Sequence, residues 1–514
     1  MQLKATSDLW WKNAVIYCVD VEQFHRDLGG LTNRIDYLAG MGVSCLWLMP
    51  FYPSRQRDDG YDITDFYGVD WRLGTPGDFV ELIRTAADRG IRVIADLVVN
   101  HTSDRHPWFR AARADRNSPY RDFYVWQDSK PAEKPGDVVF PDKETSNWHF
   151  DQKAKQWYLH RFYSFKPDLN VANPQVRDEI AQVVGYWLDQ GLAGFRVDAV
   201  PFLLEPMGMP RGAMHDPHDL LTDLRRFMGR RRGDAVLLGE VNLAPDQQRA
   251  FFGDEDGDEL HMVLSFTVNQ AMFLAFARGQ AAPLEQALRA LPEIPEDSQW
   301  ANFVRNHDEL TLDKLSDAER AEVFAAFGPE KRHQLYGRGL RRRLPSMVDG
   351  DEDRIRLAYS LAFSLPGTPV LFYGEEVGMR EDLDLPGRMS VRAPMDWEAV
   401  GTQRRDNESL LMWMERLIRR RRECPELGWG RMTVIDTGDE AVFGHRADWQ
   451  GSTVVAVHSL ASEPRTVSLE SDGPLVDLFA SEELAPRDGR VDVDVGRYGG
   501  RWFRVSRPGD PAPP

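Results

Sequence analysis

The feature that most constrains the fold is a series of eight short apolar segments, each ending in polar or acidic residues. They occupy residues 14–19, 44–50, 91–100, 191–199, 234–240, 261–266, 302–308 and 368–374. Segments of this length, separated by amphipathic stretches such as 78–90 and 174–191, predict buried parallel strands connected by helices. Eight of them predict a closed α/β barrel of the (β/α)₈ type rather than an open sheet.

The spacing of these segments predicts the domain organisation. Asp198 and Glu240 lie 42 residues apart, about one strand–helix unit, whereas 98 residues separate Asn100 from Asp198. An irregular lobe is therefore expected after the third strand. From residue 428 on, short alternating segments separated by Gly, Asp and Pro predict an antiparallel β-sandwich. The expected divisions are a barrel of residues 1–100 and 171–427, a lobe of 101–170, a sandwich of 428–506 and a disordered tail of 507–514.

A second excursion from the barrel is expected at about residues 311–357. It carries the basic run LRRRL (340–344). Arginine side chains with apolar stems and charged heads are typical of a solvated or interface face of a helix, and that is the expectation for this run.

Composition excludes several classes of protein. The chain has 63 basic and 81 acidic residues, a net charge of −18, so nucleic acid and anionic membrane surfaces are poor partners. No apolar run reaches the roughly 18 residues of a membrane helix, and the first residues hold no apolar signal core. Cys18, Cys45 and Cys424 show neither zinc nor disulfide spacing. We therefore expect a soluble, cytoplasmic protein, and leave open whether it forms a homo-oligomer.

Chemically active residues cluster at the ends of the predicted strands, where barrels of this type place their functional groups. They are Asp96, Asn100, His101, Arg196, Asp198, Glu240, His307 and Asp308. The sequence contains no Gly-rich phosphate loop, no metal triad at helical spacing and no Ser or Cys nucleophile signature. Paired carboxylates without a redox cofactor suit glycosyl transfer, in which one acid is ionised and the other is protonated.

Local context predicts which acid takes which state. Arg196 lies two residues before Asp198 on the same face of a strand and would keep that aspartate anionic. Glu240 ends an apolar strand, so partial burial would raise its pKa towards that of a useful acid. The alternative for Asp198, Glu240 and Asp308 is structural ion pairing at the barrel rim. Asp96 is expected to be a structural hydrogen-bonding group.

Four motifs carry a resemblance to a known family: DLVVNH (96–101), GFRVDAV (194–200), LLGEV (237–241) and FVRNHD (303–308). In these motifs and their order the chain resembles the α-amylase superfamily, glycoside hydrolase family thirteen, from about Trp10 to the C-terminal sandwich. The resemblance implies Asp198 as nucleophile, Glu240 as acid/base and Asp308 as transition-state stabiliser. It also implies retention of α configuration through a covalent glucosyl-enzyme, with the first two carboxyls about 5–5.5 Å apart.

Finer motifs resemble the group of trehalose synthases and oligosaccharide α-glucosidases. They are DDGYDITDFYG (58–68), KPDLN (166–170), RNHDELTL (305–312), SLPGTPVLFYGEEVGM (364–379) and VRAPMDW (391–397). The resemblance implies that Asp58 binds hydroxyls of the non-reducing glucose and that Tyr61 stacks on its ring, a role compatible with core packing. Arg392 matches an arginine at the sugar site of that group. The rest of the expected sugar-binding set is His101, Arg196 and His307.

The resemblance also implies one structural Ca²⁺ and no organic cofactor. The residues that match the calcium ligands of the group are Asn100, Asp168 and Glu205, with the main-chain carbonyls of Phe202 and Leu203. Without a metal, Asn100 and Asp168 would hydrogen-bond across the lobe. Another metal loop of the family is shortened here to VDVEQFHRDLGG (19–30), which lacks alternating oxygen ligands, so that site is expected to be absent.

The expected function is that of a retaining, trehalose synthase-like enzyme. It would act on small α-linked sugars such as maltose, trehalose and short oligosaccharides, by transfer, hydrolysis or both. Two alternatives stay open: a plain α-glucosidase or amylase-type hydrolase, and a non-catalytic amylase-like subunit that binds sugar or a partner protein. A barrel aldolase or metal-dependent isomerase is disfavoured, because neither a Schiff-base lysine nor a metal triad lies at the strand ends.

Overall fold

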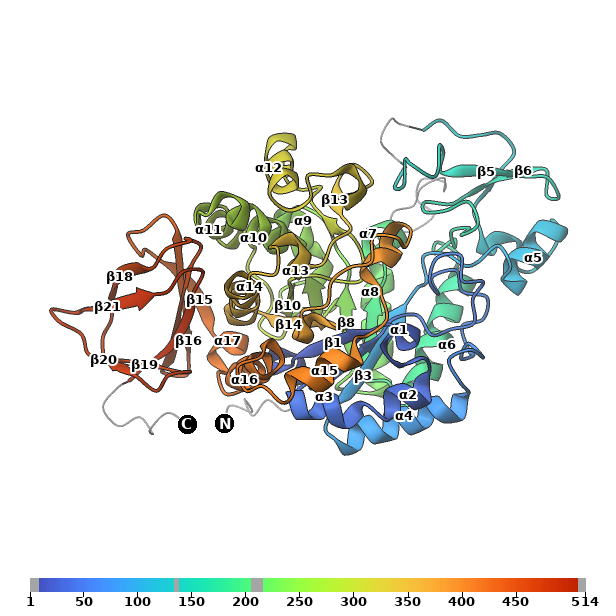
Figure 1. Cartoon of the computed structure of the whole chain (residues 1–514). Coiled ribbons are helices and arrows are strands. Elements are labelled where there is room, and N and C mark those ends of the chain that lie inside the picture. Colours follow the sequence, from blue (N-terminus) through green and yellow to red (C-terminus); the bar gives the residue numbers. More distant parts are fainter. Residues whose placement is uncertain (1–8, 134–137, 205–215, 507–514) are drawn as a thin grey trace.

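The computed structural model describes residues 9–133, 138–204 and 216–506. The expected tail of residues 507–514 and the expected metal ligand Glu205 lie outside the described residues. Figure 1 shows a central barrel, with the C-terminal sheets on one side and the lobe that contains β5 and β6 on the other.

Eight parallel strands close the barrel, which confirms the predicted fold class. Their order around the barrel is β1-β14-β10-β9-β8-β7-β3-β2. Their bounds are Ile16–Val19 (β1), Cys45–Leu48 (β2), Arg92–Leu97 (β3), Gly194–Val197 (β7), Val236–Gly239 (β8), Met262–Leu264 (β9), Gln299–Phe303 (β10) and Thr368–Phe372 (β14).

The position predicted for the seventh barrel strand is wrong. That strand was expected at residues 302–308, but β10 pairs with β9 from Gln299 onwards and with β14 up to Phe303. The polar residues that follow leave the sheet, since the amide of Arg305 donates to the Glu375 carboxylate at 3.2 Å rather than to a neighbouring strand. Asp308 therefore lies in the loop after the strand.

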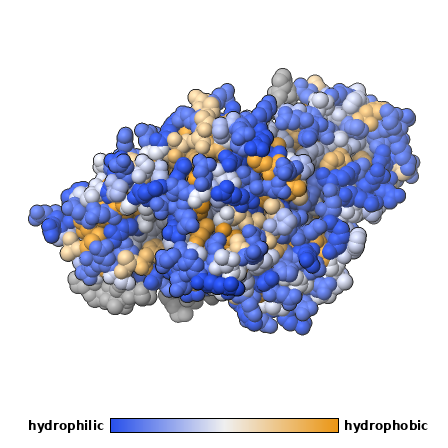
Figure 2. Space-filling view, in the orientation of Figure 1, coloured by the Kyte–Doolittle hydropathy of each residue, from blue (hydrophilic) through white to orange (hydrophobic). Residues whose placement is uncertain are grey.

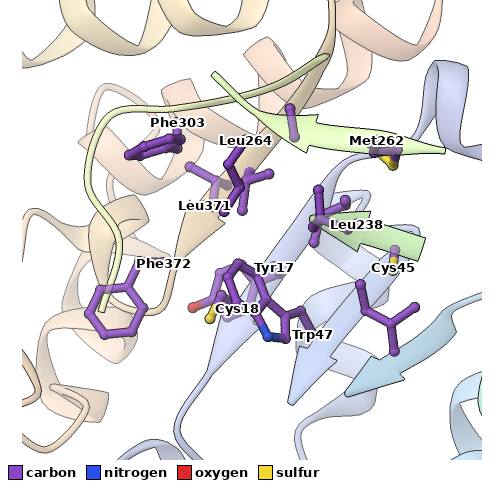
Figure 3. Packing of buried hydrophobic residues seen from close by; sticks show 14 of the residues in the cluster. Tyr17, Cys18, Cys45, Trp47, Leu238, Met262, Leu264, Phe303, Leu371 and Phe372 are labelled. Atoms are coloured by element: carbon purple, nitrogen blue, oxygen red, sulfur yellow. The ribbon is translucent and has the colours of Figure 1, made fainter. Parts of the chain in front are cut away.

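The barrel is filled by its own side chains. Figure 3 shows buried side chains from several barrel strands, among them Tyr17, Trp47, Leu264 and Leu371, which belong to one hydrophobic cluster. Because such a barrel is a packed core and not a pore, a ligand can bind only at its rim.

The helices that connect the strands begin at strong capping signals. Thr75 and Asp78 form a reciprocal capping box before and within α4 (Pro76–Asp88), and Asn173 accepts the amide of Gln175 at the start of α6 (Pro174–Asp189). Other helices around the barrel are α3 (Ile35–Met41), α8 (Asp219–Arg231), α10 (Phe266–Arg278), α11 (Ala282–Arg289), α14 (Glu352–Ser364) and α16 (Leu410–Arg422).

The segment inserted after β3 is a small lobe with its own sheet. It contains α5 (Pro107–Ala114) and the antiparallel strands β4 (Trp126–Gln127), β6 (Gln156–Leu159) and β5 (Trp148–Asp151). An isolated bridge between His101 and Asp168 joins the two ends of the insertion. The lobe is thereby held at the barrel mouth.

The excursion after β10 forms a second cover. It contains β11 (Leu310–Thr311), α12 (Asp317–Phe327), β12 (Gln334–Leu335), β13 (Gly339–Leu340) and α13 (Leu344–Met347). The prediction for the LRRRL run is wrong, because its arginines precede α13 and are not a helix face. Arg343 is buried and donates to the carbonyls of Tyr373 (2.7 Å) and Val391 (2.9 Å). The run ties the excursion to the segment after β14, because one guanidinium can satisfy several buried carbonyls.

The C-terminal residues form two antiparallel sheets. The larger has the order β15-β16-β17-β22-β19-β20 and the smaller pairs β18 with β21. Valine and leucine side chains from both sheets share a core. The bounds are Arg431–Ile435 (β15), Val442–Trp449 (β16), Ser452–Ser459 (β17), Arg465–Glu470 (β18), Leu475–Asp477 (β19), Glu483–Leu484 (β20), Arg490–Val495 (β21) and Gly500–Val505 (β22).

Figure 2 shows a mostly hydrophilic face on which hydrophobic residues occur only in scattered patches. Within the described residues, no helix is both long and apolar enough to cross a bilayer.

Candidate active site

Strand register brings two of the expected acids side by side. β7 lies between β3 and β8, with Asp96 opposite Arg196 and Val197 opposite Gly239. One residue further, Asp198 leaves β7 beside Glu240, whose amide donates to the Val197 carbonyl at 3.0 Å. The alternation of side chains along β7 puts Arg196 and Asp198 on one face.

A single buried guanidinium connects these acids. Arg196 Nη1 lies 2.6 Å from Asp198 Oδ1 and 3.0 Å from Asp96 Oδ1, while its Nη2 lies 2.8 Å from Glu240 Oε2. One guanidinium therefore bridges the carboxylates of Asp198 and Glu240, which places the two groups close together. Both line the same cavity.

One positive charge among three carboxylates leaves a surplus of negative charge. Burial raises the pKa of Glu240 to about 7, with the charges of Asp198 and Asp308 adding to the rise and Arg196 opposing it. Burial also raises the pKa of Asp198, against the opposing charge of Arg196. Since Asp198 makes the shorter contact with Arg196, the arrangement favours an ionised Asp198 and a Glu240 that holds a proton near neutral pH.

The backbone between the two acids helps to orient the second one. Ala199 adopts a left-handed conformation with φ of +50°, and its amide donates to Glu240 Oε2 at 3.0 Å. A left-handed alanine costs about 1 kcal/mol. Strain of this kind persists where the surrounding structure requires it, as at a functional site.

Asp308 is a fixed negative charge on the same cavity wall. Its Oδ1 lies 2.9 Å from Arg392 Nη2 and 3.1 Å from Arg388 Nη1. Arg388 belongs to the 3-10 helix η6 (Gly387–Val391), and Arg392 directly follows that helix. Burial disfavours its ionised form, but the charges of Arg388 and its neighbours outweigh burial and hold the pKa of Asp308 well below the usual range. Arg392 also binds Asp59 at 2.5 Å.

A tight turn presents the segment that was expected to clamp the glucose. Asp59 (φ +48°) and Gly60 (φ +90°) are its central residues, and the amide of Tyr61 donates to the Asp58 carbonyl at 2.9 Å. The sequence Asp-Gly favours this turn because both central positions need positive φ. The carboxylate of Asp58 forms an ion pair with Lys166 of the KPDLN motif.

Tyr61 is held by three polar neighbours. Its hydroxyl lies 2.8 Å from Asp96 Oδ2 and 2.8 Å from His307 Nε2. Because its single hydrogen goes to the carboxylate, which only accepts, His307 must donate from Nε2. His101 Nε2 lies 3.0 Å from the Tyr61 carbonyl. Asp96 thus has the hydrogen-bonding role that was expected of it.

A cavity of about 400 Å³ opens between the barrel mouth, the lobe and the excursion. This volume is within the range of small-molecule sites. The predicted catalytic and sugar-binding residues on its wall are Asp58, Tyr61, His101, Asp198, Glu240 and Asp308, and Phe202 of the expected calcium site also lines it. The other predicted sugar-binding residues lie one layer behind, since the side chains of Arg196, His307 and Arg392 are 1%, 1% and 3% exposed. Arg196 and Arg392 contact the carboxylates, and His307 contacts the Tyr61 hydroxyl.

The described part of the expected calcium site lies where the lobe meets the barrel. The side chain of Asn100 hydrogen-bonds to the Asp168 carboxylate, and Phe202 and Leu203 belong to α7 (Val200–Leu204). Arg161 Nε lies 3.7 Å from Asp168 Oδ2. No group of three or more His, Cys, Asp or Glu side chains within the described ranges could hold a metal ion.

Sequence reasoning did not select Asp59, Lys166 or Arg388, although each forms an ion pair in the site. A signal was available for Asp59, which is adjacent to Asp58 in the motif that was expected to bind the glucose. For Arg388, the only feature of the local sequence that could have indicated a role in the site is its position four residues before Arg392.

Comparisons with known proteins agree with this geometry. The chain matches the family described as "Alpha amylase, catalytic domain" over residues 18–324, and residues 451–504 match "Sucrose hydrolase-like, C-terminal domain". It is 37% identical to the trehalose synthase/amylase TreS of Mycobacterium tuberculosis (strain CDC 1551 / Oshkosh), over 98% of this chain and 92% of that protein. It is 36% identical to the trehalose synthase of Pimelobacter sp. (strain R48), over 97% of this chain and 96% of that protein.

Solved structures show the same likeness. The crystal structure of the alpha-amylase from H. orenii matches with a TM-score of 0.79 at 26% identity, covering 96% of this chain and 100% of that one. The matches run through the barrel with its strand-end acids, the lobe and the C-terminal sheets. The chain therefore belongs to the α-amylase family of glycoside hydrolases and is a trehalose synthase-like glycoside hydrolase or transglucosylase.

Proposed function

We propose that this protein interconverts maltose and trehalose by cleaving the α-glucosidic bond and transferring the glucosyl group back to the freed glucose. The observation that carries the proposal is the pair of Asp198 and Glu240 on one guanidinium in one cavity, with Asp308 on the same wall. The likeness over nearly the whole chain to proteins named trehalose synthase supports the choice of substrates.

In the first half-reaction, a carboxylate oxygen of Asp198 bonds to the anomeric carbon of the non-reducing glucose. The bond between that carbon and the glycosidic oxygen breaks, and Glu240 gives its proton to that oxygen. A pKa of about 7 keeps much of Glu240 protonated at neutral pH. The ionised Asp308 stabilises the positive charge that develops on the ring.

In the second half-reaction, Glu240 is ionised and takes the proton of an incoming hydroxyl. The oxygen of that hydroxyl bonds to the anomeric carbon as the ester bond to Asp198 breaks. Two displacements at the same carbon retain the α configuration. A hydroxyl of the freed glucose yields the isomeric disaccharide, whereas water yields two glucose molecules.

Contacts between the two covers of the cavity support transfer over hydrolysis. The ring centroids of Phe140 in the lobe and Tyr336 in the excursion are 4.8 Å apart, and the hydroxyls of Tyr163 and Tyr336 are 3.5 Å apart. Phe140 lines the cavity. Covers that meet over a cavity keep water out and keep the freed glucose in.

The test is a product profile with maltose as the only substrate, followed by chromatography of trehalose and glucose. We expect trehalose to accumulate in excess of glucose. With p-nitrophenyl α-D-glucoside as substrate, NMR of the freshly released glucose should show the α anomer. Glucose without trehalose would refute the isomerase and leave an α-glucosidase, the second candidate.

Asp198→Asn serves as the control of that experiment. We expect it to abolish both products, because no carboxylate remains to form the ester. If its turnover equalled that of the wild type, the assignment of Asp198 as nucleophile would be wrong. If the wild type itself formed no product, the non-catalytic alternative would be supported.

We also propose one structural Ca²⁺, bound by Asn100, Asp168, Glu205 and the carbonyls of Phe202 and Leu203. The oxygen donors suit this ion, and burial raises the pKa of Asp168 to about 6, a penalty that a bound cation offsets. The ion would tie the lobe to the barrel and would take no part in the chemistry.

Calcium binding is tested by thermal unfolding of chelator-treated protein. We expect excess Ca²⁺ to raise Tm by a few degrees, because a ligand bound only to the folded state stabilises it. Asp168→Asn should lose this response, and Asp128→Asn, a change at an 83% exposed side chain of the lobe, should keep it. If the Tm of the wild type does not change with Ca²⁺, the proposed calcium site is wrong.

We infer a cytoplasmic location as well. Cys18, Cys45 and Cys424 are free thiols in the structure, and free thiols are the rule in reducing compartments. Cell fractionation with an antibody against the protein tests this.

A further inference from the structure

The cavity extends beyond the acids to a basic rim on the side of the leaving group. Glu240 would protonate the leaving oxygen, so residues adjacent to Glu240 border the leaving group. Two residues after it, Asn242 lines the cavity and its side-chain amide donates to Asp313 Oδ1 at 3.0 Å. Lys314 and Arg338 line the cavity next to this pair. The two cations are therefore on the side where an acceptor binds.

Arg338 forms no ion pair with a described carboxylate within 4.0 Å of its guanidinium, although its charge helps to lower the pKa of Asp313 from a longer distance. Its guanidinium lies 5.8 Å from the ring centroid of Tyr336, and the side chain is half-buried. Its main chain is fixed, because its carbonyl accepts the amide of Leu312 at 2.8 Å. An arginine fixed at a cavity wall in this way can donate two parallel hydrogen bonds to a carboxylate or phosphate.

Lys314 adds a second donor at the same rim. Its Nζ lies 3.0 Å from Asp313 Oδ2, and its side chain is 30% exposed. Asp313 is also held by the side-chain amides of Asn242 (3.0 Å) and Gln270 (3.3 Å). Since an ammonium has three donors, Lys314 keeps donors for a ligand while it contacts Asp313.

The cations at the inner end of the cavity are committed to acids. Lys166 pairs with Asp58, and Arg388 contacts Asp308 at 3.1 Å and Glu309 at 2.6 Å. Lys314 pairs with Asp313, so Arg338 is the cation on the described wall of this cavity that forms no ion pair.

We propose that the acceptor side recognises a small sugar or polyol that carries an acidic group, a carboxylate or a phosphate, bound by Arg338 and Lys314. The inference rests on the proposed glucosyl transfer and names the class of molecule that receives or releases the glucose. A hydroxyl oxygen of the acceptor bonds to the anomeric carbon, its proton goes to Glu240, and the ester bond to Asp198 breaks. The acidic group is not consumed and only positions the acceptor.

The experiment uses the full chain and p-nitrophenyl α-D-glucoside as donor, because release of p-nitrophenol reports the first half-reaction whichever acceptor is present. Glucose, glucose 6-phosphate and glucuronate are compared as acceptors, and the transfer products are quantified by mass spectrometry. We expect at least one acidic acceptor to reach half-maximal transfer at a concentration about tenfold below that of glucose, with the difference narrowing as salt is added. Comparison of glucose 6-phosphate with glucuronate shows whether a phosphate or a carboxylate is preferred. Equal half-maximal concentrations for all three acceptors would overturn the inference.

Variants test whether the named cations cause the preference. The readout is the ratio of half-saturating concentrations for acidic and neutral acceptors within one variant, which is independent of its overall activity. Arg338→Gln and Lys314→Gln should each bring that ratio close to one. The matched control is Arg332→Gln, an arginine of the same excursion that is 65% exposed and lies 3.0 Å from Glu330, and it should keep the wild-type ratio.

Failure of this inference is distinguishable from failure of the proposed function. Transfer to glucose that is unaffected by an acidic group, or a preference that survives both substitutions, refutes the basic acceptor site alone. Absence of p-nitrophenol and glucose release from every donor refutes the glucosyl chemistry itself.

Discussion

The charge balance around Arg196 explains how neighbouring carboxylates can hold different protonation states. Its guanidinium contacts Asp96, Asp198 and Glu240, and it cannot neutralise all three. Asp308 stays ionised because it has arginines of its own. The least compensated buried carboxyl then keeps a proton, and that is Glu240.

The first prediction concerns the pH dependence that Glu240 imposes. With a pKa of about 7, Glu240 loses its proton as pH rises through that value, so kcat/KM for maltose should fall on the alkaline side. Glu240→Gln should lower turnover of maltose by about 100-fold or more but spare the first half-reaction of p-nitrophenyl α-glucoside, whose leaving group needs no proton. An alkaline limb that persists in this variant would assign it to another group.

A second prediction concerns Arg196→Lys. A lysine keeps the charge but cannot hold Asp198 and Glu240 through two fixed nitrogens, so kcat should fall by at least about tenfold. The free energy of unfolding should also fall by about 1–3 kcal/mol, because a buried carboxylate loses a hydrogen-bond donor.

Steady-state kinetics and thermal unfolding measure both effects of this substitution. Arg89→Lys is the matched control, since Arg89 pairs with Asp36 at 2.6 Å while 48% exposed. It should change stability by no more than about 0.5 kcal/mol. Wild-type kcat in the Arg196 variant would show that the two-nitrogen contact is dispensable.

At the scale of elements, two insertions into the barrel build the cavity that the strands alone do not enclose. The lobe follows β3 and the excursion follows β10, and Figure 1 shows β5 and β13 above the same end of the barrel. Tyr336 joins them by contact with Phe140 and Tyr163. Arg388 lies 5.2 Å from the Phe140 ring and 5.7 Å from that of Tyr336, which links the contact to Asp308.

A third prediction follows for Tyr336→Ala. Loss of the ring should open the cavity to water and raise the fraction of maltose that ends as glucose by about threefold or more, while the first half-reaction persists. The ratio of glucose to trehalose measures this partition. Tyr120→Ala, which removes a ring of the lobe that packs on Trp108 and not on the cavity, should leave the ratio unchanged. An unchanged ratio in the Tyr336 variant would place the water barrier elsewhere.

At the scale of the whole molecule, the C-terminal sheets are anchored to the barrel through a buried polar contact. Trp502 of β22 is fully buried, and its Nε1 donates to Ser360 Oγ of α14 at 3.1 Å. The same hydroxyl lies 2.9 Å from His458 Nε2. Trp502 belongs to the hydrophobic cluster that includes the barrel strands, so the larger sheet shares a core with the barrel, whereas the two C-terminal sheets pack on each other through a separate cluster.

The fourth prediction is that Trp502→Ala destabilises the whole chain without changing the chemistry. Loss of a buried indole should cost about 3–5 kcal/mol in the free energy of unfolding, while kcat well below Tm stays close to that of the wild type. Thermal or denaturant unfolding measures the difference. Trp71→Ala is the matched control, because Trp71 is 84% exposed, and it should cost no more than about 0.5 kcal/mol. Equal Tm values for the two variants would contradict a shared core.

Particular residues show how far sequence reasoning reached. The barrel strands could be predicted because a buried parallel strand is marked by its own apolar run. The prediction for residues 302–308 failed because a polar loop follows β10 within the same motif. Asp198, Glu240 and Asp308 could be placed on one rim because the ends of barrel strands meet there. Lys166 could not be assigned to Asp58, because 108 residues separate them.

The sequence alone predicted the barrel and the acids that lie at its rim, since strand patterning and strand ends are local properties of the chain. The pairing of cations with acids depends on the folded chain: Arg392 binds Asp59 and Asp308, and Arg388 binds Asp308 and Glu309. The fold also leaves Arg338 without an ion pair within 4.0 Å among the described residues. Electrostatic interactions depend on distance in space and on burial, and neither quantity is written in the order of the residues.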